Sequence, residues 1–124
     1  MSGFSTIVDR VPLPELLNQL AEECAELAQA ALKYRRAIEG TNYTPVSAYE
    51  CRKNLLEEIA DVCLTEDVLI FKLGNPMELA PEIKNMQIFK ETRWARRLTD
   101  PHICGPDYRD IDQPPTELDP PRME

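Results

Sequence analysis

Apolar residues recur at alternating steps of four and three over residues 14–39, which is the spacing of one face of an α-helix. The stripe consists of Leu20, Cys24, Leu27, Ala31, Tyr34 and Ile38. Pro12 and Pro14 suit the entry to a helix, where a missing N–H does no harm, and Gly40 suits its end. The pattern predicts a first long helix over residues 14–39, after a short lead-in over residues 1–12.

A second long helix is predicted over residues 45–73. Thr44 and Pro45 form a start signal, and Gly74 with Pro76 forms a stop signal. Its apolar stripe consists of Leu55 or Leu56, Ile59, Val62 or Cys63, Leu69 or Ile70, and Leu73. Glu66 and Asp67 interrupt the stripe, either as a turn or surface edge at the end of the core, or as carboxylates that support Asp61.

A third helix is predicted over residues 81–98, starting at Pro81. Its apolar positions are Ile83, Met86, Ile88 or Phe89, Trp94 and Leu98, and its other face is basic, with Lys84, Lys90, Arg93, Arg96 and Arg97. Two interpretations of the basic face stay open. It is either a solvated face that pairs with acidic neighbours, or a phosphate-binding face on which arginine acts as a bidentate donor.

The character of the chain changes after the third helix. Six of the eleven prolines lie beyond Thr99, where apolar residues are sparse, so this segment cannot build a core of its own. We therefore predict an all-α domain over residues 1–98, a bundle of three main helices, and an acidic, proline-rich arm over residues 99–124. His102 and Cys104, near the start of this arm, are only a weak metal signal.

Composition and charge argue against some classes of function. The net charge of −8 argues against a nucleic-acid-binding surface as the main role. No apolar run approaches the length of a membrane span, and the N-terminus lacks the pattern of a signal peptide. Cys24 and Cys63 fall among apolar helix positions, so we expect buried free thiols rather than disulfides, and a cytoplasmic location.

Paired carboxylates are the main chemical feature of the two long helices. Glu23 precedes Glu26 by three residues on the first, and Glu58 precedes Asp61 by three on the second, so each pair shares one helix face. If the helices pack antiparallel at this level, four carboxylates converge and repel one another. A divalent cation relieves that repulsion, and all-oxygen ligands suit Mg²⁺, or Mn²⁺ in its place.

Two helices that carry paired carboxylates suit three uses. A di-iron bundle needs Glu-x-x-His pairs, whereas the single histidine of this chain, His102, lies outside the helices. The second use is a purely structural or interaction module whose acidic face is solvated. The third is a Mg²⁺-dependent hydrolase that acts on a polyphosphate.

The double motif resembles the signature of the MazG-like all-α nucleoside triphosphate pyrophosphohydrolases. The matching residues are Glu22, Glu23 and Glu26 on the first helix and Glu58 and Asp61 on the second. The segment Phe89–Arg93 with Arg97 is similar to the basic third-helix segment of phage and bacterial MazG-like proteins. The resemblance covers roughly residues 14–98.

The resemblance implies hydrolysis of a (deoxy)nucleoside triphosphate to the monophosphate and pyrophosphate. By analogy, Glu23, Glu26, Glu58 and Asp61 bind Mg²⁺, and Glu22 is a supporting group or a base. Triphosphate contacts are expected from Lys90, Arg93 and Arg97, and more weakly from Lys33, Arg36 and Lys53. The resemblance also implies a homo-oligomer, either a dimer or a tetramer, that completes the bundle.

The sequence does not select the residues that would form the walls of a base-binding site. Phe4, Tyr34, Tyr43, Tyr49 and Trp94 are all available, and each of them suits a core or an interface as well. The alternative function is a non-catalytic helical interaction module with a solvated acidic face.

Overall fold

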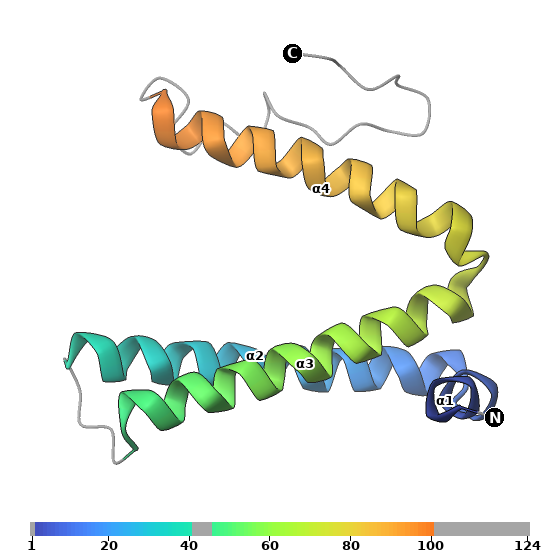
Figure 1. Cartoon of the computed structure of the whole chain (residues 1–124), viewed down its shortest axis with the longest axis horizontal. Coiled ribbons are helices and arrows are strands. Elements are labelled where there is room, and N and C mark those ends of the chain that lie inside the picture. The colour runs from blue at the N-terminus through green and yellow to red at the C-terminus, as the bar shows by residue number, and fades with distance from the viewer. Residues whose placement is uncertain (1, 41–45, 101–124) are drawn as a thin grey trace. The chain divides into compact units, whose positions relative to one another are not determined.

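The computed structural model describes residues 2–40 and 46–100 of the chain. In these residues the regular elements are helices: α1 (Gly3–Arg10), α2 (Leu13–Glu39), α3 (Ala48–Leu73) and α4 (Pro76–Thr99) (Figure 1). The predicted all-α class is confirmed. None of the helices in the described ranges is long and apolar enough to cross a membrane.

The chain divides into two units, residues 1–75 and residues 76–124. The first holds α1, α2 and α3, and the second begins with α4. The predicted boundary after residue 98 falls within the second unit, and the association of α4 with the other two long helices in one bundle stays a prediction. Most of the predicted arm, with His102 and Cys104, lies outside the described residues.

The helix α1 was not predicted, because residues 1–12 were expected to be a lead-in. The Ser2 hydroxyl caps it by accepting a hydrogen bond from the Ser5 N–H, at 3.2 Å. Phe4 then packs edge-on against Phe71 of α3, with ring centroids 5.0 Å apart. The helix is only eight residues long, so contact with α3 supplies stability that its own backbone cannot.

The predicted signals mark both ends of α2 and the C-terminal end of α3, but not the start of α3. Pro12 and Pro14 open α2, and Gly40 closes it in the left-handed conformation, with φ of 66°. Gly74 closes α3 as predicted. The start of α3 was predicted wrongly: Ser47 is its cap, and its hydroxyl accepts from the Glu50 N–H, so the helix starts at Ala48 rather than at Pro45. Thr44 and Pro45 lie outside the described residues.

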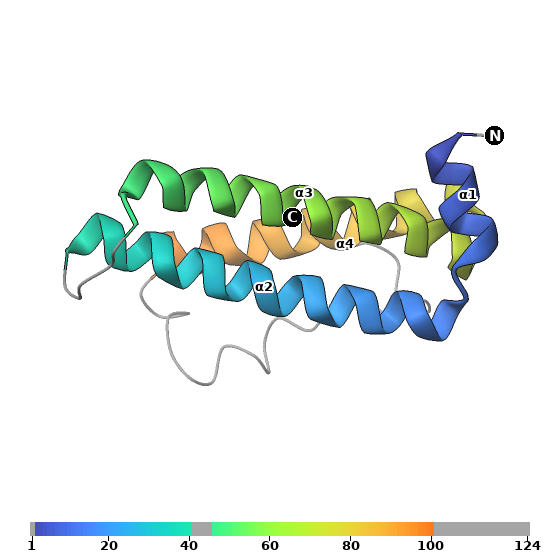
Figure 2. The same ribbon diagram turned by 90° about the horizontal axis from the view of Figure 1, so that it is seen from below.

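The helices α2 and α3 form an antiparallel hairpin and run side by side along their length (Figure 2). Alternating steps of four and three bring one row of each helix to the contact, and we call these two rows the seam. On α2 the seam is Leu16, Leu20, Glu23, Leu27, Ala30, Tyr34 and Ala37, and on α3 it is Cys51, Leu55, Glu58, Val62, Thr65 and Leu69, all of them buried or half-buried.

The predicted stripes coincide with the seam at some positions and miss it by one residue at others. Leu20, Leu27 and Tyr34 were predicted correctly, and so were Leu55, Val62 and Leu69 as one option of each pair. Cys24 and Cys63, which were predicted to be buried, are exposed free thiols. Two apolar rows lie beside each other on both helices, and spacing alone does not distinguish the row that meets the partner helix.

In the second unit, α4 starts at Pro76 rather than at the predicted Pro81, which lies inside the helix. Pro81 lies beyond the first four helix positions, whose N–H groups have no intrahelical acceptor, so the helix lacks one hydrogen bond that another residue at this position would donate. Glu66 and Asp67 are exposed and lie within the continuous helix α3, which favours a surface edge over a turn.

Candidate metal centre

Glu23 and Glu58 occupy seam positions, where the neighbouring seam residues are mostly apolar. Glu23 follows Leu20 and precedes Leu27 in the α2 row, and Glu58 lies between Leu55 and Val62 in the α3 row. Both side chains are half-buried. The helix contact therefore directs the two carboxylates toward each other instead of leaving both in solvent, where glutamate is usually found.

The structure brings three of the predicted ligands together. Carboxylate oxygens of Glu23, Glu26 and Glu58 all lie within 4.8 Å of one another. Asp61, the fourth predicted ligand, is exposed one turn after Glu58, and its charge acts on Glu58. Glu22 is exposed and stands outside the group of three.

Two oxygens of this group have no hydrogen-bond donor in the described part of the chain. Glu23 Oε2 and Glu58 Oε2 are shielded from solvent, and neither accepts a hydrogen bond there. The other oxygen of Glu23 accepts from Gln19 Nε2 at 2.6 Å. A shielded carboxylate oxygen without a donor is costly, and a cation is the partner that would satisfy both oxygens at once.

The electrostatics of Glu58 agree with this arrangement. Desolvation raises the pKa of Glu58 above its ordinary value, and the negative charges of Glu26, Asp61 and Glu23 raise it further, as does a hydrogen bond with Glu26. Repulsion of this kind is expected where carboxylates converge without a counter-charge. The donor set, all carboxylate oxygens, fits Mg²⁺ or Mn²⁺.

Two clefts lie on one face of the hairpin, at either side of the carboxylates. The smaller, of about 170 Å³, is lined by Glu26 and Glu58 and by the polar side chains of Gln29, Lys33 and Asn54, with Ala30 and Cys51 beside them, and we call it the polar cleft. The larger, of about 380 Å³, has Glu23 and Asp61 at one end and apolar walls from three helices, including Ile7, Leu16 and Val68. We call this side of the hairpin the cleft face.

The basic residues predicted to contact the triphosphate belong to three helices. Lys33 lies in the polar cleft with Glu26 and Glu58. Lys53 is exposed and lines neither cleft, and Arg36 is half-buried outside them. Lys90, Arg93 and Arg97 are on α4 in the second unit, so their approach to the carboxylates stays a prediction.

Gln29 and Asn54 were not predicted as site residues. Gln29 lies three residues after Glu26, and Asn54 lies four residues before Glu58, so each is a helical neighbour of a predicted ligand. This spacing was a usable signal in the sequence. Of the aromatic candidates for a base-binding wall, Phe4 packs on Phe71, Tyr49 and Trp94 are exposed, and Tyr43 lies outside the described residues.

Comparison with known proteins gives no relative: no family model matches the chain, and no curated protein or solved structure is significantly similar to it.

Proposed function

We propose that this protein is a Mg²⁺-dependent nucleotide pyrophosphohydrolase, which cleaves a (deoxy)nucleoside triphosphate to the monophosphate and pyrophosphate. The observation that carries the proposal is the meeting of Glu23, Glu26 and Glu58 where α2 contacts α3, with two shielded oxygens that have no donor within residues 2–40 and 46–100. Asp61 follows on the same face of α3 as Glu58. The resemblance of these residues to the MazG-like motif supplies the reaction.

Glu23, Glu26, Glu58 and Asp61 would hold the metal, which supplies positive charge to phosphate oxygens and lowers the pKa of a bound water. Lys33 lines the polar cleft beside Glu26 and Glu58, and it would donate hydrogen bonds to a phosphate bound there. Glu22, beside the cluster on α2, is our candidate for a supporting group or proton acceptor. The apolar cleft beside Glu23 and Asp61 offers walls for the less polar part of a nucleotide.

The proposal is tested by a screen of ribo- and deoxyribonucleoside triphosphates for pyrophosphate release with Mg²⁺. We expect at least one nucleotide to give a monophosphate and pyrophosphate in equal amounts, and chelation of the metal to stop the release. The alternative, a non-catalytic interaction module with a solvated acidic face, predicts no release from any nucleotide. The half-buried seam positions of Glu23 and Glu58 favour the enzyme over that alternative.

A further inference from the structure

Uncharged amide side chains accompany the three clustered carboxylates along both helices. The helical neighbours of a glutamate are the residues three or four positions away, and these are the positions from which lysine or arginine forms ion pairs with it. At these distances from Glu23, Glu26 and Glu58 the sequence has neither lysine nor arginine. It has amides instead, one for each carboxylate: Gln19 four residues before Glu23, Gln29 three residues after Glu26, and Asn54 four residues before Glu58.

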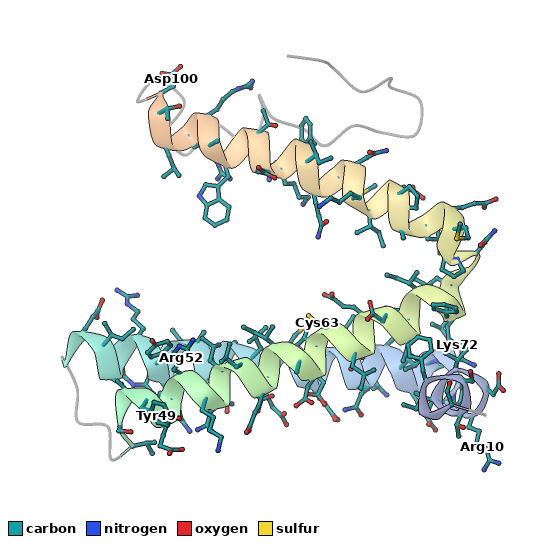
Figure 3. The ribbon with its side chains drawn as sticks, in the orientation of Figure 1. Arg10, Tyr49, Arg52, Cys63, Lys72 and Asp100 are labelled. Atoms are coloured by element: carbon teal, nitrogen blue, oxygen red, sulfur yellow. The ribbon has the colours of Figure 1, made fainter. Side chains whose placement is uncertain are left out.

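An amide and a basic side chain would affect a metal site in opposite ways. A lysine or arginine paired with one of the carboxylates would neutralise charge that a bound cation needs. An amide donates a hydrogen bond and leaves the negative charge in place. Figure 3 shows Arg52 toward one end of the hairpin, and Lys72 with Arg10 of α1 toward the other end.

Gln19 makes such a hydrogen bond to Glu23. Its Nε2 atom donates to Glu23 Oε1 at 2.6 Å, a short distance that agrees with a charged acceptor. Glu23 Oε2 is the oxygen that is shielded from solvent and has no donor within residues 2–40 and 46–100. Gln19 and Glu23 line the larger cleft together, on the cleft face. The hydrogen bond therefore fixes one oxygen of Glu23 and leaves the other for a cation.

We propose that Gln19 is a positioning residue of the metal site, whose amide holds the Glu23 carboxylate so that Oε2 is available to the cation. Groups that hydrogen-bond to a metal ligand fix its orientation, and their loss costs about 10- to 100-fold in metal affinity. An ordinary surface pair at this spacing would contribute only to the stability of α2. The inference rests on the metal site of the proposed function, and it does not depend on the nucleotide or on the reaction.

The affinity of the full-length protein for Mn²⁺ tests the proposal without a substrate, with the free ion measured by electron paramagnetic resonance. Gln19→Leu removes the amide and keeps most of the side-chain volume. The dissociation constant for Mn²⁺ should rise roughly tenfold. The melting temperature in a chelator should stay nearly unchanged, because the Gln19–Glu23 hydrogen bond is exposed. Asn18→Leu makes the same kind of change at the adjacent exposed position, which lines neither cleft, and should leave the Mn²⁺ affinity unchanged.

A double-mutant cycle separates positioning of Glu23 from a general effect on the helix. In a Glu23→Gln background the ligand through which Gln19 acts is already lost, so adding Gln19→Leu should change the Mn²⁺ dissociation constant by less than about twofold. In a Glu26→Gln background Glu23 is still present, and Gln19→Leu should again raise the dissociation constant roughly tenfold. Circular dichroism establishes that each variant is folded.

The possible outcomes separate this proposal from the proposed reaction. An unchanged Mn²⁺ affinity in Gln19→Leu, or an equal effect of that substitution in both backgrounds, would overturn the positioning role and leave the metal site standing. A wild type that binds no Mn²⁺ would overturn the metal site and the positioning role together. If the cycle behaves as expected but no nucleotide releases pyrophosphate, the positioning role is supported and only the proposed reaction is removed.

Discussion

At the scale of single residues, carboxylates occupy two seam positions of the hairpin. Glu23 and Glu58 stand where their seam neighbours Leu20, Leu27 and Val62 make apolar contacts. An ordinary hairpin would gain stability from apolar residues at both positions. The proposed metal site would account for the repulsion and for the shielded oxygens.

The assignment of Asp61 to the metal site gives a prediction on activity. Asp61→Asn keeps the shape of the side chain but removes a negative charge from the proposed ligand set. Loss of one positioned electrostatic group costs on the order of 10²–10³ in rate, so pyrophosphate release should nearly vanish. Initial rates with saturating nucleotide and Mg²⁺ are the measurement.

Glu39→Gln is the matched control for that variant. Glu39 lies at the end of α2, where it forms an exposed ion pair with Arg35 at 3.1 Å. Exposed pairs contribute little to stability, so the variant should stay folded and keep most of its activity. Equal rates from the two variants would remove Asp61 from the proposed site.

The raised pKa of Glu58 gives a prediction on stability without metal. The folded protein retains the Glu58 proton at pH values where the unfolded chain has released it, so the folded state binds more protons. The free energy of unfolding then falls as pH rises from the ordinary glutamate pKa of about 4.3 through the raised value. In the presence of a chelator, Glu58→Gln should therefore raise the melting temperature at neutral pH and leave it nearly unchanged in acid.

Glu57→Gln serves as the control, because it removes a charge from the adjacent, exposed position. It should change the melting temperature less than Glu58→Gln does at neutral pH. If Glu58→Gln instead destabilises the metal-free protein at neutral pH, the carboxylates do not repel one another as inferred here.

At the scale of elements, the hairpin has a small fully buried core. Leu16 is 3% exposed, Cys51 2% and Val68 1%, and the last of these has the largest side chain that is fully buried in the described residues. Leu16 and Val68 also form part of the apolar cleft, beside Ile7 of α1. The stability of the first unit therefore depends on a few contacts among its three helices.

Leu16→Ala should cost about 2–5 kcal/mol in the free energy of unfolding, because it removes buried methyl groups and leaves a cavity. Chemical denaturation followed by circular dichroism measures this change. Leu32→Ala is the comparison, since Leu32 on the same helix is 54% exposed and its truncation should cost far less. Similar losses from the two variants would show that Leu16 does not pack as described.

At the scale of the whole molecule, binding of a metal ion should increase the free energy of unfolding. A cation that binds only the folded state, present at about 100 times its dissociation constant, adds roughly 2.7 kcal/mol to the free energy of unfolding. Millimolar Mg²⁺ should therefore raise the melting temperature of the wild type, and the increase should be smaller in Glu58→Gln. If neither protein responds to Mg²⁺ and the two melt alike, the carboxylates do not form a metal site.

The proline-rich, acidic composition beyond Thr99 predicts that this segment is separate from the catalytic core. A chain truncated after Thr99 should keep its helical content and its Mg²⁺-dependent rise in melting temperature. A change in mass on truncation, with the helices intact, would show that the segment contributes to assembly.

The sequence by itself determined the helical class, the C-terminal ends of the three long helices to within a residue, and the pairing of carboxylates. These features are local. Gly40 ends α2 through its own left-handed backbone conformation, and a spacing of three puts Glu58 and Asp61 on one face of any helix. The carboxylates of the candidate metal centre, Glu23, Glu26 and Glu58, could be found for the same reason, because their grouping within each helix does not depend on a partner.

Only the tertiary structure decided which of two adjacent apolar rows became the seam. Cys24 and Cys63 fit a helical stripe as well as Glu23 and Val62 do, and their exposure follows from how α2 and α3 are rotated about their axes. That rotation depends on side chains far apart in the chain, as does the docking of α1 through Phe4 and Phe71. It turns the carboxylates inward and the clefts to one side, and it leaves the apolar row of Leu56 and Ile59 on the other.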